Sequence, residues 1–327
     1  MPSGRGRLTF NGAITRSFQG SSGVMEFNVA LLDGGVPQSL APTDVSFSIP
    51  SVTDLQGIPL PVSVSLAPGQ IQPPSPGLAD NPLVMGILMD SSGSLFVTDR
   101  QDRRFLAAFG LLEQFRSSPL DLGAVLRFDN RQTGFGVTAL GRPLQTAQLL
   151  QGFTSDQAAL QRGILLSTPG GNTALYDASL EAAQFLSDFR QSENLNRRLV
   201  VFSDGIDNDS RLTLAQAITG IQALPNGSGL GIPTYIVGLG TDLDLFELQQ
   251  MAAATQGTFA LAKVAEDLGD PFANFFPAAI GENRVEVRVE STSALAPGNY
   301  LLSGSLQINR GGISLTTAFR DAALVVR

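Results

Sequence analysis

The first and last parts of the chain alternate apolar with more polar residues. Clear examples cover residues 25–31, where every second side chain is large and apolar, and residues 285–289, where valines alternate with charged residues. A period of two is typical of strands that bury one face of an antiparallel sheet. Further strands of this kind are expected near 45–49, 62–66, 299–308 and 312–326. Turn residues stand at Asn11-Gly12 and Asp33-Gly34-Gly35.

The pattern changes in the middle of the chain. Residues 67–77 are dense in proline and are expected to form a linker, because proline cannot continue a central strand. Beyond it, strands are expected at 83–89, 122–128, 134–140, 198–203, 233–239 and 257–262, with 134–140 at an edge. Helices are expected near 98–116, 155–167, 174–190, 211–223 and 243–256. Strands that alternate with helices predict an α/β fold, a doubly wound and mostly parallel sheet covered on both faces.

The two β-rich flanks are each small. The C-terminal one is short for a stable domain, whereas both together have the size of an immunoglobulin-like sandwich. We therefore expect a discontinuous β-sandwich of residues 1–80 and 281–327 that is interrupted by an α/β domain of residues 81–280, since insertion is tolerated where the guest's termini lie close together. The alternative is two separate small β modules that flank the α/β domain.

Oxygen-bearing side chains stand where predicted strands end. Asp90, Ser92 and Ser94 follow the apolar strand 83–89, and Asp204 follows the strand 198–203. Thr173 lies in a glycine-rich loop just before a predicted helix. Ligands of open α/β sheets bind outside the carboxyl ends of the strands, so these side chains can meet there. Carboxylate and hydroxyl oxygens suit Mg²⁺ or another hard divalent cation.

Residues 83–265 resemble the von Willebrand factor A (vWA) domain family. The resemblance rests on Asp90-x-Ser-x-Ser94 and on four further stretches, residues 171–177, 200–211, 232–240 and 248–257. It implies a Rossmann-like fold and a metal-ion-dependent adhesion site (MIDAS). In that site Ser92 and Ser94 would bind the ion directly, Thr173 directly or through water, and Asp90 and Asp204 directly or through bridging waters. The resemblance implies Mg²⁺, although the ligand types do not distinguish it from Mn²⁺ or Ca²⁺.

Composition excludes several kinds of chemistry. The chain of 327 residues has neither cysteine nor histidine, so disulfides, Cys/His zinc sites and Ser-His triads are impossible. A net charge of −8 argues against a nucleic-acid partner, whose phosphates need neutralising by Lys and Arg. No apolar run is long enough to span a membrane.

Most of the negative charge lies between residues 83 and 278. Part of it is the acidic surrounding expected near a cation, with a possible ligand-binding rim formed by Asp207, Asp209, Asp242 and Asp244. The alternative is that these four are ordinary turn and helix-cap carboxylates.

These features favour a binding protein over an enzyme. We expect a protein partner to present an Asp or Glu side chain that completes the coordination of the ion. One alternative is an intracellular assembly subunit that docks on an ATPase partner. Another is Mg²⁺-dependent hydrolysis, although an Asp nucleophile would need a second acid where Ser92 stands. We expect the protein at the cell surface or secreted, with a leader absent from this sequence, and a cytoplasmic location is the alternative.

Overall fold

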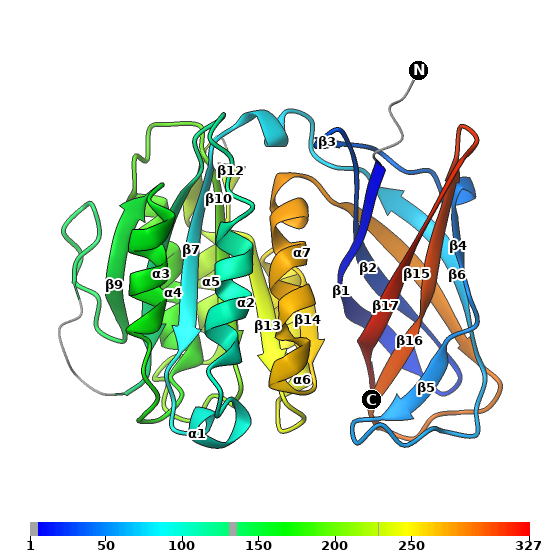
Figure 1. Cartoon of the computed structure of the whole chain (residues 1–327). Helices are drawn as coiled ribbons and strands as arrows, with labels where there is room; N and C mark the ends of the chain where they lie inside the picture. The colour runs from blue at the N-terminus through cyan, green and yellow to red at the C-terminus, as the bar shows by residue number, and fades with distance from the viewer. Residues whose placement is uncertain (1–5, 131–135, 228) are drawn as a thin grey trace.

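The computed structural model describes residues 6–130, 136–227 and 229–327. Two halves lie side by side, one a sheet covered by helices and the other a pair of sheets without helices between them (Figure 1). The helical half contains the middle of the chain, and the other half contains both ends.

The central sheet of the helical half has six strands in the order β14-β13-β10-β7-β8-β9. These strands are β7 (Leu83–Asp90), β8 (Leu122–Phe128), β9 (Ala147–Thr154), β10 (Asn196–Ser203), β13 (Thr234–Leu239) and β14 (Phe259–Ala262). All neighbours are parallel except β8 and β9, so the sheet is mixed. The expected α/β layout is therefore present, with one antiparallel edge strand.

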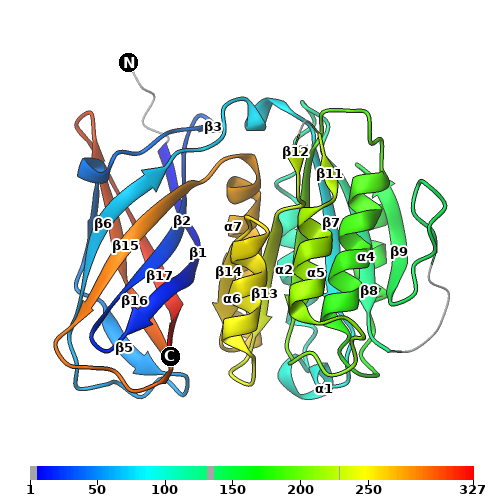
Figure 2. The same ribbon diagram turned by 180° about the vertical axis from the view of Figure 1, so that it is seen from behind.

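Helices cover both faces of this sheet. They are α1 (Leu95–Thr98), α2 (Arg103–Leu112), α3 (Gln157–Leu165), α4 (Leu175–Asp188), α5 (Leu214–Gln222), α6 (Leu245–Ala254) and α7 (Gly269–Ile280). α2, α3 and α7 pack on one face and α4, α5 and α6 on the other (Figures 1 and 2). Successive residues of β7 enter opposite cores: Leu88 packs with α4, and Ile87 and Met89 pack on the other face. All eight residues of β7 are buried, which is why this strand reads as one continuous apolar run.

The second half contains two antiparallel sheets. One has the order β1-β2-β15-β6, with β3 beside β2, and the other has the order β17-β16-β4, with β5 beside β16. The strands are β1 (Gly6–Gln19), β2 (Ser22–Asp33), β3 (Val36–Pro37), β4 (Val45–Phe47), β5 (Ser51–Asp54), β6 (Val64–Gln72), β15 (Asn283–Ser291), β16 (Gly298–Arg310) and β17 (Ile313–Val326). Short 3₁₀ turns occur at Pro42–Asp44, Leu78–Asp80 and Ala265–Leu268 (η1, η2 and η3), and a small hairpin joins β11 (Pro225–Asn226) to β12 (Gly229–Leu230).

Strands from the two ends of the chain pair with each other. β15 lies between β2 and β6, and β4 and β5 both pair with β16. Apolar side chains from both segments share one core, in which Phe27, Val287 and Phe319 are completely buried. The immunoglobulin-like description and the domain limits at residues 80 and 281 remain predictions.

Several sequence-based expectations about the helical half need correction. The edge strand expected over 134–140 is wrong: its first two residues lie outside the described part, residues 136–140 form no strand, and β9 takes the edge position. β9 pairs with β8 through two register shifts, which break the alternation that a sequence pattern relies on. The helix expected over 98–116 is the shorter α2, which begins only after Asp102 with its φ of 53°, and the separate helix α1 precedes it.

Other corrections concern the flanks and α7. β6 runs through Pro68, inside the expected linker, because it is an edge strand with a register shift at this point. Asn11-Gly12 is an irregularity within β1 and not a turn. β4 ends at Phe47, which leaves Ile49 82% exposed. Helix α7 was not expected, because it is apolar on most sides and contains Pro277.

Candidate metal centre

Asp90 and Asp204 reach the same point because β7 and β10 are neighbouring parallel strands. Met89 pairs with Phe202, so the residues after them leave the sheet side by side. Ser203 Oγ donates to Asp90 Oδ2 at 2.7 Å, and the Ser92 amide donates to Asp90 Oδ1 at 2.7 Å. Both oxygens of the fully buried Asp90 are therefore held in place.

The two serines after Asp90 point toward Asp204. Ser94 Oγ donates to Asp204 Oδ1 at 2.8 Å, and Ser92 Oγ lies 3.4 Å from the same oxygen. The two hydroxyl oxygens are 2.9 Å apart. Four of the five expected site residues therefore form one hydrogen-bonded group at the carboxyl ends of β7 and β10.

Thr173 stands beside this group. A Cβ placed on Gly205 would lie 3.3 Å from Thr173 Oγ1 and 3.9 Å from Ser94 Oγ. The glycine-rich loop before Thr173 is fixed to the first loop, since the Gly93 amide donates to Gly171 O at 2.9 Å. Asn208 Oδ1 accepts from the Thr173 amide at 2.9 Å, which joins this loop to the loop after β10.

Burial makes both carboxylates costly to ionise, and the charge of Asp204 adds to this cost at Asp90. Burial, and then the charge of Asp204, raise the pKa of Asp90 to about 7. Burial also raises the pKa of Asp204, although hydrogen bonds from Thr98, Ser94 and Ser92 oppose this. Within the described ranges no Arg or Lys pairs with either carboxylate. Two close acidic groups that lack a basic partner are suited to a bound cation.

The donor set also fits a hard divalent ion. It consists of two carboxylates and three hydroxyls, all oxygen ligands of the kind that Mg²⁺ and Mn²⁺ prefer. In the part of the chain that the structure describes, no three His, Cys, Asp or Glu side chains cluster in a way that could hold a metal. Any ion here would therefore depend on Ser92, Ser94 and Thr173 as well as on the two carboxylates.

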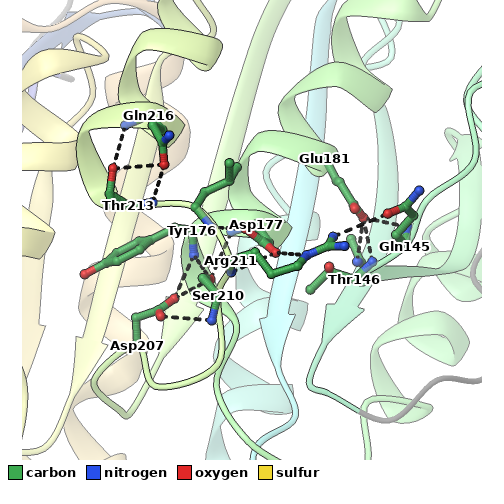
Figure 3. Close-up of polar contacts among 12 residues, drawn as sticks. Gln145, Thr146, Tyr176, Asp177, Glu181, Asp207, Ser210, Arg211, Thr213 and Gln216 are labelled. Atoms are coloured by element: carbon green, nitrogen blue, oxygen red, sulfur yellow. Dashed lines mark hydrogen bonds and ion pairs between the residues drawn. The ribbon is translucent and has the colours of Figure 1, made fainter.

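The four possible rim residues differ in their surroundings. Asp207 accepts from the Tyr176 amide and from Ser210, so it caps α4 and closes its own loop (Figure 3). Asp244 is the N-cap of α6 and accepts from the Glu247 amide at 3.0 Å. Asp209 and Asp242 are exposed. Two of the four therefore have the helix-cap role of the alternative reading, and the rim remains a prediction.

Sequence reasoning missed two residues that hold the carboxylates. Thr98 Oγ1 donates to Asp204 Oδ2, and Ser203 supports Asp90 as described above. Thr98 lies four residues after Ser94, which is one turn along α1, so helical spacing was the signal that could have found it. Ser203 becomes visible only once β7 and β10 are known to be neighbours.

Apolar side chains are exposed next to the same group. Phe96 and Val97 of α1 are 63% and 68% exposed, and Ile206 after Asp204 is 47% exposed. Phe96 is the one exposed phenylalanine among the described residues. The polar oxygens thus lie beside an apolar border.

Polar contacts, some of them buried, fix the loops around the group. Arg104 is fully buried and donates to Asp99 Oδ2 at 2.7 Å and to Ser167 O at 3.0 Å. This links α1 to the segment that precedes the glycine-rich loop. On the other side Asp177 binds Arg211, with Arg211 Nε 3.1 Å from its carboxylate (Figure 3). Glu181 accepts three backbone amides, from residues 145–147.

No family model matches the chain, and no curated protein does either. Solved structures resemble it loosely. A von Willebrand factor type A protein from Catenulispora acidiphila is 13% identical, with 98% of this chain and 73% of that chain covered and a TM-score of 0.46. The pilus adhesin SpaC from Lactobacillus rhamnosus GG is 10% identical, with coverages of 87% and 49% and a TM-score of 0.45.

A third structure is the manganese-loaded TRAP protein from Plasmodium vivax. It is 12% identical, with 80% of this chain and 97% of that chain covered and a TM-score of 0.43. TM-scores below 0.5 at such identities are too low to assign a function. The chain's own strand order and side chains must therefore carry the assignment. Among the described residues, no helix is long and apolar enough to cross a membrane.

Proposed function

We propose that this chain is a vWA-type binding protein that holds one divalent cation with Asp90, Ser92, Ser94, Thr173 and Asp204. One observation supports the proposal most strongly: Asp90 and Asp204 lie together at the ends of neighbouring strands and are hydrogen-bonded to serine hydroxyls. Mg²⁺ is the ion we expect, and Mn²⁺ or Ca²⁺ could replace it.

The proposed ligands leave the ion able to bind a further group. When bound, Mg²⁺ would supply a positive centre that takes six oxygen ligands, and the two carboxylates and three hydroxyls would supply five of them. Ser203 and Thr98 orient the two carboxylates, while Ser92, Ser94 and Thr173 contribute oxygen without charge. This favours an outside carboxylate, so we propose a protein partner that presents Asp or Glu.

The apolar border gives this partner a second means of contact. Phe96, Val97 and Ile206 would bury apolar area against a partner whose acidic side chain reaches the ion. Adhesion to an outside partner would place the protein at the cell surface or in the medium, and that location follows from the proposed function alone.

We propose binding and not catalysis. The chain has no His or Cys for proton transfer, and Lys263 is its single amine side chain. Ser92 stands where an Asp-based phosphoryl-transfer site would need a second acid.

A pull-down from extracellular-matrix extract tests the proposal. The native chain, Ser92→Ala and Asp204→Ala serve as bait in Mg²⁺ and in EDTA, and circular dichroism checks that each is folded. We expect the native bait to capture a partner in Mg²⁺ and to release it in EDTA, while neither variant captures it. Equal capture by folded Asp204→Ala, or capture that EDTA does not affect, would contradict the proposal.

A further inference from the structure

A cleft of about 730 Å³ lies where the two halves of the molecule meet. Its walls are β1 and β17 from one half, and β14, η3 and the start of α7 from the other. This volume is within the range of small-molecule binding sites. None of the proposed metal ligands lines it.

A buried amide in the cleft wall has an unused donor. Asn11 is 1% exposed, its Oδ1 accepts from Thr9, and no described residue accepts a hydrogen bond from its Nδ2. Asn11 stands at the irregularity of β1, between Phe10 and Gly12, which pair with consecutive residues of β2. A bulge of this kind redirects a side chain, and an unpaired buried donor costs about 1–3 kcal/mol unless a ligand satisfies it.

Strand β17, in the same wall as β1, has a second irregularity. β17 shifts register against β16 between Phe319 and Ala322, and Asp321 there adopts φ 51°. Asp321 Oδ1 lies 3.2 Å from the ammonium of Lys263, which follows β14. An ion pair between two residues of the cleft lining therefore joins the two halves of the molecule.

The remaining charges in the cleft wall are mainly negative. Glu266, Asp267 and Asp270 are exposed acids, and Arg320 is the exposed base. Among the described residues, no ion pair joins any of these four to another side chain. The surplus of negative charge favours a positively charged group near the opening.

Three strand edges also border the cleft. β1, β14 and β17 are each the outermost strand of their sheet, so each has one side without a neighbouring strand in that sheet. Outermost strands present backbone donors and acceptors to an added chain. One of these acceptors, Phe10 O, already binds Asn274 Nδ2 at 2.9 Å.

We propose that this cleft binds an extended peptide segment that carries Arg or Lys side chains. A backbone carbonyl of the peptide would accept from Asn11 Nδ2, and a basic side chain would lie against Glu266, Asp267 and Asp270. A peptide satisfies both requirements at once, whereas the cleft lacks an exposed aromatic ring on which a sugar could stack, since Phe10 and Phe259 are part-buried and buried.

Fluorescence polarisation of the full chain tests this proposal. The probes are labelled, amidated pentapeptides, Thr-Arg-Val-Arg-Thr and its charge-reversed match Thr-Glu-Val-Glu-Thr. EDTA is present throughout, so the outcome does not depend on the proposed metal centre. We expect the Arg peptide to bind at least about tenfold more tightly than the Glu peptide.

Two variants locate the binding. Glu266→Gln/Asp267→Asn/Asp270→Asn changes only exposed groups and should weaken Arg-peptide binding about tenfold. Its matched control, Glu113→Gln/Glu193→Gln/Glu290→Gln, removes three exposed acids outside the cleft and should leave the affinity unchanged. Asn11→Leu keeps the side chain's approximate shape without its donor and should also weaken binding.

Several results would overturn the proposal. They are equal binding of the two peptides, no binding of either, and Arg-peptide affinity that the cleft triple variant does not change. Displacement of the Arg peptide by maltotriose would show that the cleft takes a saccharide instead.

Discussion

At the scale of single residues, Asp90 and Asp204 depend on hydroxyl groups that are not themselves proposed as metal ligands. Ser203 holds one carboxylate and Thr98 the other, each through a side-chain hydrogen bond. Groups that orient a metal ligand in this way contribute about 10–100-fold to metal affinity in proteins.

Ser203→Ala and Thr98→Val are therefore expected to weaken Mn²⁺ binding at least about tenfold while the chain stays folded. Electron paramagnetic resonance of free Mn²⁺ measures the affinity, and circular dichroism checks the fold. Thr219→Val is the control, since its hydroxyl bonds only to Ala215 O within α5. Unchanged Mn²⁺ affinity in both variants would show that these hydroxyls do not support the site.

The candidate ligands were visible in the sequence because each stands directly after a strongly apolar strand or in a glycine-rich loop. Their neighbours were not. Ser203 required the β7–β10 pairing, and Thr98 required the short helix α1, which was not expected from the sequence. A local sequence pattern identifies candidate ligands within one segment. Contacts between segments can be predicted only when the pairing of the strands is known.

At the scale of elements, the turn between α1 and α2 depends on one buried ion pair. Arg104 and Asp99 are both fully buried, and Asp99 also accepts from the amides of residues 103 and 104. Removal of one partner leaves a buried charge without compensation.

Arg104→Met is therefore expected to lower the free energy of unfolding by about 3–5 kcal/mol. Urea denaturation measures it. The matched control is Arg103→Met, whose guanidinium contacts Gln101 near the surface and which should change stability by less than about 0.5 kcal/mol. Equal effects of the two substitutions would mean that the buried pair has no special role.

Buried strands that are strongly apolar and helices with a clear period were predicted well, as β7, β10 and α4 illustrate. Prediction was poorer where tertiary contacts determine the element. β6 continues through Pro68 because its outer edge needs no ladder hydrogen bond there. Helix α7 lies between the two halves, so it lacks the polar stripe that is typical of a surface helix.

At the scale of the whole molecule, the two halves approach each other closely at Gly12. A Cβ on this residue would lie 2.2 Å from Phe259 O of β14, and its φ of 150° is also unfavourable for other residues. β1 can lie against the central sheet only because this side chain is absent.

Gly12→Ala is therefore expected to lower the free energy of unfolding by about 1–3 kcal/mol, because the backbone must move to admit the methyl group. Gly110→Ala is the control: it lies in α2 with open space around it and should gain up to about 1 kcal/mol. Thermal unfolding compares the two. A Gly12→Ala variant as stable as the native chain would show that β1 can move away from β14 without loss of free energy of unfolding.

Glu282, at the junction of α7 and β15, links stability to pH. Burial raises its pKa, although Arg284 and Asn28 partly oppose the shift. Because the folded-state pKa is above the unfolded value of 4.5, the stabilising contribution is present below that pH and is lost as pH rises through the folded pKa.

Glu282→Gln removes this titration and keeps an acceptor for Asn28 Nδ2. The unfolding free energy of the native chain minus that of the variant should therefore fall as the pH rises from 4.5. Urea denaturation in EDTA at several pH values measures the difference. A difference that rises with pH would mean that the folded-state pKa is lowered.

Divalent-ion binding is the central claim, and isothermal titration calorimetry tests it most directly. The EDTA-treated, folded full chain is titrated with Mg²⁺ and then with Mn²⁺, beside Asp90→Asn as the matched variant. We expect one ion per chain for the native protein and none for the variant. No uptake of either ion by the native chain, or equal uptake by Asp90→Asn, would contradict the proposed metal centre.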